Sequence, residues 1–418
     1  DTGAVAPGAQ LAGHDLGIPA GAPRSRDFER QDAALREMPR RLLAELLLHV
    51  LDFASFHYQV ASRSSLTAVT IWGLRGPRHV LEHDAEVTGI RFLPLGDRVV
   101  TYGPHRDAVV WDAGSGARLR MLRHEGRVDC ARTFPSGDRV VTCDSLGGTL
   151  IWDAASGDVL HRMMPPGANE SGALAASTLL SEVAVFPAGD RVLSWWPLEW
   201  AVIWDASTGM AVCELRGHRA AIASGAVFPR GDRVVTGSYD TTAVVWDAGS
   251  CEALLRLPTN GWVTDLAVLS DGDRVATLGT DGKPVVWDTR SGQVEHVLVN
   301  PALPGWGTAI GMRTFPWDYR LLTYGIDTIA IWDSRTGEVL RRIDNQDPIY
   351  EVEIAHGLDT FVVCGRRNIT IRDVGSGRKL CHQPSSAAVR SRCSAAIGLG
   401  TALDPRGFGR GLSWRHLP

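Results

Sequence analysis

The sequence predicts an all-β fold built from one repeated unit of four short strands, because three motifs recur in phase along most of its 418 residues. The first motif is Trp-Asp or a close relative, which occurs eight times from Trp72-Gly73 to Arg372-Asp373 at intervals of 39 to 52 residues. The second is "GDRVVT" or a variant, shortly before the tryptophan, and the third is a turn after it, as in "WDAGSG" and "WDTRSG".

The strands of the unit follow from its turn residues and its β-branched runs. The glycine and aspartate of "GDR" predict a turn, and the "VVT" after it is a β-branched strand. A second turn precedes an alternating run such as "TAVVW", and the "SG" or "TG" turn leads to a strand such as "ARLRML". One four-stranded sheet cannot bury both faces, so we expect the units to stack around a common axis, which also removes long open edges.

We expect eight units in preference to seven. The earliest copy of the third strand lies in residues 60–72. These residues align without gaps to residues 234–246, so they are a true copy of the repeat. This copy has no strand before it, because a helix is predicted there. Residues 387–399 are the candidate for the missing strand, which would pair with the first unit and close the ring.

From Phe56 to Gln383 the chain resembles the WD40-repeat β-propeller family, because several motifs of that family recur together at its period. The clearest copy covers residues 216–247. The resemblance implies a structural tetrad in this copy, which is a hydrogen-bond relay that ties three strands of one blade and is not a catalytic pair. The members of the tetrad are His218, Thr236, Asp240 and Trp246.

Most other copies depart from the tetrad. Only one of them keeps an aspartate at the position of Asp240, namely Asp281, and Arg372 replaces the last tryptophan. The other residues found at the Asp240 position are Leu66, His105, Leu146 and Leu198. We therefore expect several blades to lack the relay and to be held together by packing instead.

Four segments are expected along the chain. They are a Gly/Ala/Pro-rich extended arm at residues 1–26, a Leu-rich helix at 27–54, the propeller at 55–383, and a ring-closing strand with a basic tail at 384–418. The arm cannot bury enough apolar surface to fold alone. The helix has an apolar face around Leu43 and Leu47 that either covers the propeller or docks on another protein, and it faintly resembles the leading helix of an F-box.

Composition and motifs exclude most chemical functions. A net charge of −4 and a pI of about 6.4 provide no basic field for nucleic acid, and the longest apolar patch, residues 42–53, is too short to span a membrane. Seven cysteines without CxxC spacing predict reduced thiols inside strands, not a disulfide framework or a zinc site. The sequence has no P-loop, HExxH or GxSxG motif. We therefore expect no catalytic residue, no cofactor and no metal, and we do not expect an enzyme.

Two further repeated features have structural interpretations. The Asp-Arg pairs of "GDR" alternate in charge along one rim, so their field should cancel, and we expect solvated turns. The histidines His83, His124 and His218 recur at equivalent turns, about one blade apart, so they cannot converge on one metal ion.

One copy replaces a polar turn with tryptophans. The stretch "LSWWPLEWAVIWD" places three of them in the loop between the second and third strands: Trp195, Trp196 and Trp200. Residues 161–186, which lead into the same blade, contain an insertion, and a later insertion adds Trp306. Both insertions are expected on the face that the family commonly uses for partners. The indoles are covered either by the insertion or by a protein partner, and two aromatic insertions on one face favour the partner.

These features predict a non-catalytic scaffold that is a stable peripheral subunit of a larger complex in an intracellular reducing compartment, either the cytosol or an organelle. The partners are expected to be proteins. No direct contact with nucleic acid and no membrane span are expected, although peripheral association with a membrane complex is compatible with the sequence. The alternative is an adaptor that recruits substrates, for example to a ubiquitin ligase. An enzyme would need titratable groups that converge in the central channel, and the sequence shows no such group. Because the chain begins with Asp1, a removed leader stays open.

Overall fold

The computed structural model describes nine segments of the chain. They are residues 58–63, 67–73, 76–164, 182–299, 309–316, 318–354, 359–365, 368–384 and 395–399. The chain divides into two compact units, Asp1–Phe53 and Ala54–Pro418, and all described residues belong to the second. The predicted arm, the predicted helix with Leu43 and Leu47, the insertion around residues 165–181 and Trp306 lie outside the described residues.

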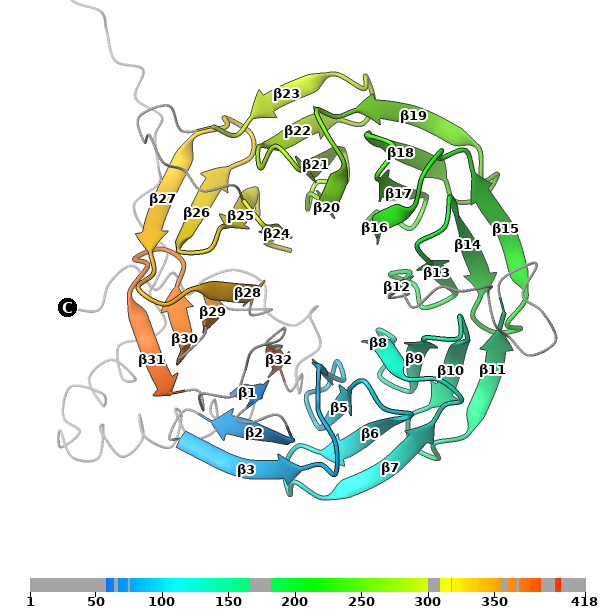
Figure 1. Ribbon diagram of the computed structural model, residues 1–418, viewed down its shortest axis with the longest axis vertical. Coiled ribbons are helices and arrows are strands. Elements are labelled where there is room, and N and C mark those ends of the chain that lie inside the picture. Colours follow the sequence, from blue (N-terminus) through cyan, green and yellow to red (C-terminus); the bar gives the residue numbers. More distant parts are fainter. Residues whose placement is uncertain are drawn as a thin grey trace, which may run out of the picture. The chain divides into compact units, whose positions relative to one another are not determined.

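The described residues form eight antiparallel sheets of four strands each, which follow one another around a ring within the unit 54–418 (Figure 1). Seven sheets consist of four strands that are consecutive in sequence, from β4–β7 to β28–β31. The remaining sheet has the order β3-β2-β1-β32 and therefore joins the two ends of the repeat region. The choice between seven and eight blades thus depends on this composite sheet.

The strand bounds show the same four positions in every sheet. The inner strands are β4 (Gly89–Phe92), β8 (Val128–Thr133), β12 (Glu182–Val185), β16 (Ile222–Val227), β20 (Val263–Val268), β24 (Gly311–Thr314), β28 (Ile349–Ile354) and β32 (Ala395–Leu399). The second strands are β1 (Tyr58–Arg63), β5 (Arg98–Tyr102), β9 (Arg139–Asp144), β13 (Arg191–Trp195), β17 (Arg233–Ser238), β21 (Arg274–Gly279), β25 (Arg320–Tyr324) and β29 (Thr360–Gly365). The third strands are β2 (Ala68–Gly73), β6 (Asp107–Asp112), β10 (Thr149–Asp153), β14 (Trp200–Asp205), β18 (Thr242–Asp247), β22 (Pro284–Asp288), β26 (Thr328–Asp333) and β30 (Asn368–Asp373). The outer strands are β3 (Gly76–Glu82), β7 (Arg118–Arg123), β11 (Val159–Met163), β15 (Ala211–Arg216), β19 (Ala253–Pro258), β23 (Val294–Val297), β27 (Val339–Asp344) and β31 (Lys379–Pro384).

The ring closes through β32. This strand lies within residues 387–399, the candidate for the missing strand, and it pairs antiparallel with β1 from Tyr58↔Leu399 to Ser62↔Ala395. The inner strands contact one another in the order β4, β8, β12, β16, β20, β24 and β28, and β32 contacts both β28 and β4. The composite sheet therefore has no unpaired inner edge at β1.

The third and fourth strands show the same irregularity in every sheet. Their register shifts at the tryptophan of the Trp-Asp motif, for example between Val245 and Trp246, and between Ile371 and Arg372 where arginine replaces the tryptophan. The first copy has the same shift between Ile71 and Trp72, so it is built like the others. A repeated β-bulge of this kind strengthens the twist of each sheet.

The hydrophobic core is divided among the boundaries between sheets. One cluster joins Phe186 and Leu193 of the β12–β15 sheet to Ile222, Val234 and Trp246 of the β16–β19 sheet. The other six described clusters likewise combine residues from two neighbouring sheets. Each sheet is thus buried by its neighbours, as a ring of stacked sheets requires.

The arginine of each "GDR" turn crosses to the next sheet. Arg191 donates hydrogen bonds to Ala248 O at 2.7 Å and to Gly231 O at 2.8 Å, and its guanidinium lies 4.3 Å from the centre of the Phe186 ring. Equivalent arginines that also reach the next sheet are Arg98, Arg139, Arg233, Arg274 and Arg320. The guanidinium donors thus satisfy backbone carbonyls of the next sheet, except at Arg320, which donates to the Asp359 carboxylate.

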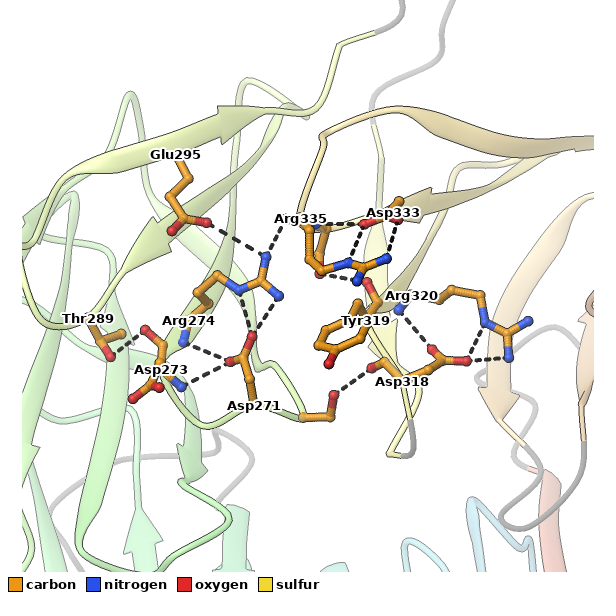
Figure 2. Close-up of polar contacts among 12 residues, drawn as sticks. Asp271, Asp273, Arg274, Thr289, Glu295, Asp318, Tyr319, Arg320, Asp333 and Arg335 are labelled. Atoms are coloured by element: carbon orange, nitrogen blue, oxygen red, sulfur yellow. Dashed lines mark hydrogen bonds and ion pairs between the residues drawn. The ribbon is translucent and has the colours of Figure 1, made fainter. Parts of the chain in front are cut away.

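Figure 2 shows the boundary between the β20–β23 and β24–β27 sheets, where Arg274 lies between Asp271 and Glu295. Arg274 also donates to Ser334 O of the next sheet at 2.6 Å. The expectation of solvated turns is therefore wrong for the arginines, which are mostly buried. It holds for the aspartates of four turns, which are exposed: Asp97, Asp138, Asp190 and Asp232.

The cysteines also differ from expectation. Cys213 on β15 and Cys251 in the turn after β18 form a disulfide between two neighbouring sheets, with Cα atoms 6.3 Å apart. The prediction that all thiols are reduced is therefore wrong for this pair. Among the described residues, Cys130, Cys143 and Cys364 are free and buried. The spacing of Cys213 and Cys251 gave no signal because ring neighbours meet only after a whole repeat.

Candidate functional site

Two kinds of loop open on the same face of the ring, here called the top face. Because the strands of a sheet alternate in direction, the loops between second and third strands lie on the same side as the loops that lead from an outer strand into the next inner strand. The Arg-containing turns and the turns after Trp-Asp lie on the opposite side. Candidate contacts with partners are therefore sought among the loops of the top face.

The β16–β19 sheet contains the complete relay at this face. Thr236 Oγ1 accepts a hydrogen bond from Trp246 Nε1 and interacts with His218 Nε2, each at 2.8 Å, while His218 Nδ1 lies 2.9 Å from Asp240 Oδ2. The relay joins the second and third strands to the loop that enters the sheet. It explains why histidine, threonine, aspartate and tryptophan occur at these spacings.

Burial sets the charge state of the relay. Desolvation lowers the pKa of His218 below its usual 6.5, and the neighbouring Asp240 opposes this effect only in part. Burial also works against the charged form of Asp240, but hydrogen bonds from Thr242, the Arg219 N–H and His218 outweigh it and lower its pKa to about 2. The Thr242 hydroxyl and the Arg256 guanidinium, 3.8 Å from Asp240 Oδ2, also adjoin this neutral histidine and ionised aspartate and extend the network.

Most sheets keep half of the relay. The indole N–H donates to a threonine or serine hydroxyl in five further sheets; the pairs are Trp111–Thr101, Trp152–Thr142, Trp204–Ser194, Trp287–Thr277 and Trp332–Thr323. The histidine also contacts this hydroxyl in two of them, through His83 and His124. The expectation that such blades lack the relay is therefore too strong, since the tryptophan bond remains in all five sheets and the histidine contact in two of them.

The β28–β31 sheet replaces both members of the remaining pair. Val363 stands at the position of Thr236, and Arg372 at that of Trp246. The Arg372 guanidinium is buried and donates to Asn345 Oδ1 at 2.9 Å and to Gly377 O at 3.1 Å. An arginine without a hydroxyl partner thus connects the third strand to the loop that enters the sheet and to the turn before the outer strand.

The predicted tryptophan platform is largely internal. Trp195 and Trp196 are each only 3% exposed and pack on opposite sides of their sheet. Trp195 packs toward the next sheet, where a Cβ on Gly225 would lie 3.0 Å from its ring, and Trp196 packs toward the previous sheet. Trp200 is half-buried, 5.6 Å from the Trp196 ring and 4.9 Å from the Arg216 guanidinium. The first two indoles therefore belong to the core.

A different aromatic pair is exposed on the top face. Tyr239, in the loop between β17 and β18, is 44% exposed, and Trp262, in the loop that enters β20, is 57% exposed. Their ring centres are 5.5 Å apart across the boundary between two sheets. Two exposed aliphatic residues, Ile310 and Ile326, lie in corresponding loops of the next sheet. Sequence reasoning missed this pair because each ring comes from a different repeat and neither interrupts its motif.

The backbone holds the exposed pair in place. Tyr239 N donates to Ala221 O at 3.0 Å, and Thr280 N donates to Trp262 O at 3.0 Å, so each loop is bonded to the other top-face loop of its own sheet. Asp240, the residue after Tyr239, is held by the relay. The rings are thus presented from an ordered backbone, which reduces the entropy lost on binding.

Titratable side chains converge on the inner strands, contrary to the sequence expectation. The Arg313 guanidinium lies 3.8 Å from Asp265 Oδ2, 3.5 Å from Glu351 Oε1 and 3.7 Å from Glu353 Oε2. Among the residues that the structure describes, no group of three or more His, Cys, Asp or Glu is placed to hold a metal ion. In this described part of the chain, no helix is long and apolar enough to cross a membrane.

The sheets, their order around the ring and the repeated tryptophan bond define a β-propeller. Residues 209–247 match the family model of the WD domain, G-beta repeat. No curated protein sequence matches the chain. Many solved structures do, among them a crystal structure of the computationally designed Ika8 protein, with a TM-score of 0.60 and 22% identity over 73% of this chain and 90% of that one. At this identity the likeness concerns the fold alone.

Residues 209–247 therefore form a WD40 repeat, within a chain that folds as a β-propeller. The matched repeat is the one that contains the complete relay, which explains why a single copy is recognised. Propellers of this family generally serve as protein-interaction scaffolds and are usually non-catalytic. The top face of this chain is therefore the place to look for its partners.

Proposed function

We propose that this protein is a non-catalytic scaffold that forms a stable peripheral subunit of a larger complex and holds a partner protein at its top face. The observation that carries the proposal is the exposed Tyr239–Trp262 pair. Tyrosine and tryptophan are enriched among the residues that dominate interface energies, and a large aromatic pair is costly to leave in water.

The position of the pair supports this assignment. It bridges two sheets, so one partner would contact both the loop of the complete relay and the loop that enters β20. Ile310 and Ile326 extend the apolar surface to the next sheet. Trp200, with the Arg216 guanidinium on its ring, supplies a further half-exposed aromatic in the preceding sheet, β12–β15.

The test is the mass and composition of the native particle, comparing wild type with Tyr239→Ala/Trp262→Ala. We expect wild type to co-elute with partner proteins at fixed stoichiometry, and the double variant to leave the particle while its unfolding curve stays unchanged. The matched control is Leu254→Ala, an exposed apolar residue on an outer strand, which should remain in the particle. A wild-type chain that runs as a 45.2 kDa monomer without partners would contradict the proposal.

We also propose that the protein works in an intracellular reducing compartment, and the state of the Cys213–Cys251 pair tests this. The Cys213–Cys251 disulfide would then form only when the protein is oxidised after extraction, so mass spectrometry after rapid alkylation of the native material should find both thiols alkylated. A quantitative disulfide in this material would instead place the chain in an oxidising compartment.

A further inference from the structure

Three arginines stand at the same position of their inner strands. They are Arg91 on β4, Arg132 on β8 and Arg313 on β24. Each stands two residues before the apolar residue that begins the turn of the "GDR" motif or its variant. All three are partly buried and donate a hydrogen bond to the carbonyl of the residue before them. They therefore have the same local geometry, and their surroundings can be compared directly.

The surroundings differ in charge. Arg313 has three carboxylates within 4 Å, as described above. Arg91 and Arg132 form no ion pair with any carboxylate among the described residues; Glu182 and Glu353 act on Arg132 only through longer-range attraction. A guanidinium has five N–H donors, and within the described part of the chain each of these two arginines uses one of them in a hydrogen bond. Attraction to surrounding groups, Glu182 and Glu353 among them, outweighs burial at Arg132 and raises its pKa, and an anion within hydrogen-bond distance of the guanidinium would stabilise its charge further.

Arg91 and Arg132 are also neighbours. Their strands β4 and β8 contact each other, and the residues that follow the two arginines are joined by a hydrogen bond from Thr133 Oγ1 to Phe92 O at 3.4 Å. Both guanidiniums act electrostatically on Tyr102, whose ring is buried. Gly89 makes room for this ring, because a Cβ there would overlap it. Two cationic forks and a phenol are thus brought to one place on the inner strands.

We propose that Arg91 and Arg132, together with the Tyr102 hydroxyl, bind an oxyanion, and that the ligand is a small molecule with a single phosphate or carboxylate group. Planar guanidinium groups bind both oxyanions through paired N–H donors, and a phenol adds one more. This site goes beyond the scaffold function, because it lies on β4, β5 and β8 and uses neither Tyr239 nor Trp262.

Carboxylates on the inner strands β20 and β28 restrict the ligand. Asp265, Glu351 and Glu353 surround a single arginine, so that side of the ring has an excess of two negative charges over Arg313. A ligand with several anionic groups would meet stronger repulsion there than a ligand with a single anionic group. Pyrophosphate should therefore bind more weakly than inorganic phosphate.

The experiment is calorimetric titration of the full chain with inorganic phosphate and, separately, with acetate, at constant ionic strength in chloride. We expect saturable binding of at least one of them at one site per chain. Arg91→Ala and Arg132→Ala should each weaken it by about tenfold or more, because each removes a charge-assisted pair of hydrogen bonds. The matched control is Arg123→Ala, an exposed arginine on the outer strand β7, which should bind like wild type.

Three results would overturn the site: no saturable binding of either anion by wild type, unchanged binding in both variants, or an equal loss in Arg123→Ala. If the alanine variants do not fold, Arg91→Lys and Arg132→Lys keep the charge and remove the fork, and they should still weaken binding severalfold. Tighter binding of pyrophosphate than of phosphate would refute the single-anion restriction.

Discussion

The β12–β15 and β16–β19 sheets are neighbours that hold the same end of the blade in different ways. In the β16–β19 sheet, Asp240 completes a hydrogen-bond relay with His218. In the β12–β15 sheet, Leu198 stands at the position of Asp240 and packs with Trp196 and Trp200 on one core cluster. Apolar packing and a polar relay are thus two solutions for the same loop, and the choice decides what the loop exposes.

The difference separates aromatic residues that stabilise from those that can recognise a partner. Where packing holds the loop, the tryptophans are turned inward and Trp195 and Trp196 are 3% exposed. Where the relay holds the loop, Tyr239 remains free to project outward beside Trp262. A cluster of tryptophans in a sequence therefore does not by itself predict an exposed surface.

The largest expected effect is on the packed loop. Trp195→Ala should lower the free energy of unfolding by about 3–5 kcal/mol, because it empties a buried space between two sheets. Equilibrium denaturation in urea measures this. The matched control is Trp262→Ala, which removes an exposed indole and should change stability by no more than about 0.5 kcal/mol. Equal effects of the two variants would show that the two loops do not differ as described.

The disulfide links the two compared sheets and gives a prediction whose sign depends on redox state. Cys251 has φ of 63° at a position where the equivalent turns of other sheets have glycine, for example Gly209 and Gly292 with φ of 71° and 72°. A left-handed conformation costs a non-glycine residue about 1 kcal/mol, whereas a disulfide contributes about 2–4 kcal/mol.

Cys251→Gly should therefore stabilise the reduced protein by about 1 kcal/mol and destabilise the oxidised protein by about 1–3 kcal/mol. Thermal unfolding with and without a thiol reductant measures both values. Cys213→Ser serves as the control, since it removes the bridge and keeps the left-handed residue. A gain in stability under both conditions would mean that the two sulfurs are not bridged in solution.

The repeat made the fold predictable, whereas the site depended on contacts between repeats. The Trp-Asp period identified the strands, because each repeat forms its own sheet. The number of blades stayed open, because β1 finds its inner neighbour, β32, at the far end of the chain. The Tyr239–Trp262 pair, the Arg191 bonds and the disulfide all join different sheets, and a motif within one repeat carries no signal for them.

The smallest expected effect concerns pH and the relay. Burial lowers the pKa of His218, so the folded protein keeps this imidazole neutral at pH values where the unfolded chain, with a pKa near 6.5, is protonated. The unfolded state then binds more protons, and stability should fall as the pH drops below about 6.5. His83 and His124, whose pKa values are lowered by burial too, act in the same direction. Asp240, with a pKa of about 2, contributes nothing to this change until the pH falls below about 4.

Asp240→Asn should sharpen this dependence. Because the aspartate raises the pKa of His218 against the effect of burial, its removal lowers that pKa further and makes the loss of stability below pH 6.5 steeper. At pH 7.5 the variant should lose about 1 kcal/mol through its weaker hydrogen bonds. The matched control is Asp281→Asn, at the same position of the β20–β23 sheet, where the aspartate accepts a bond from Lys283 N and has no histidine partner. Unfolding curves between pH 7.5 and 5 compare the two, and equal slopes would show that the relay does not govern the protonation of His218.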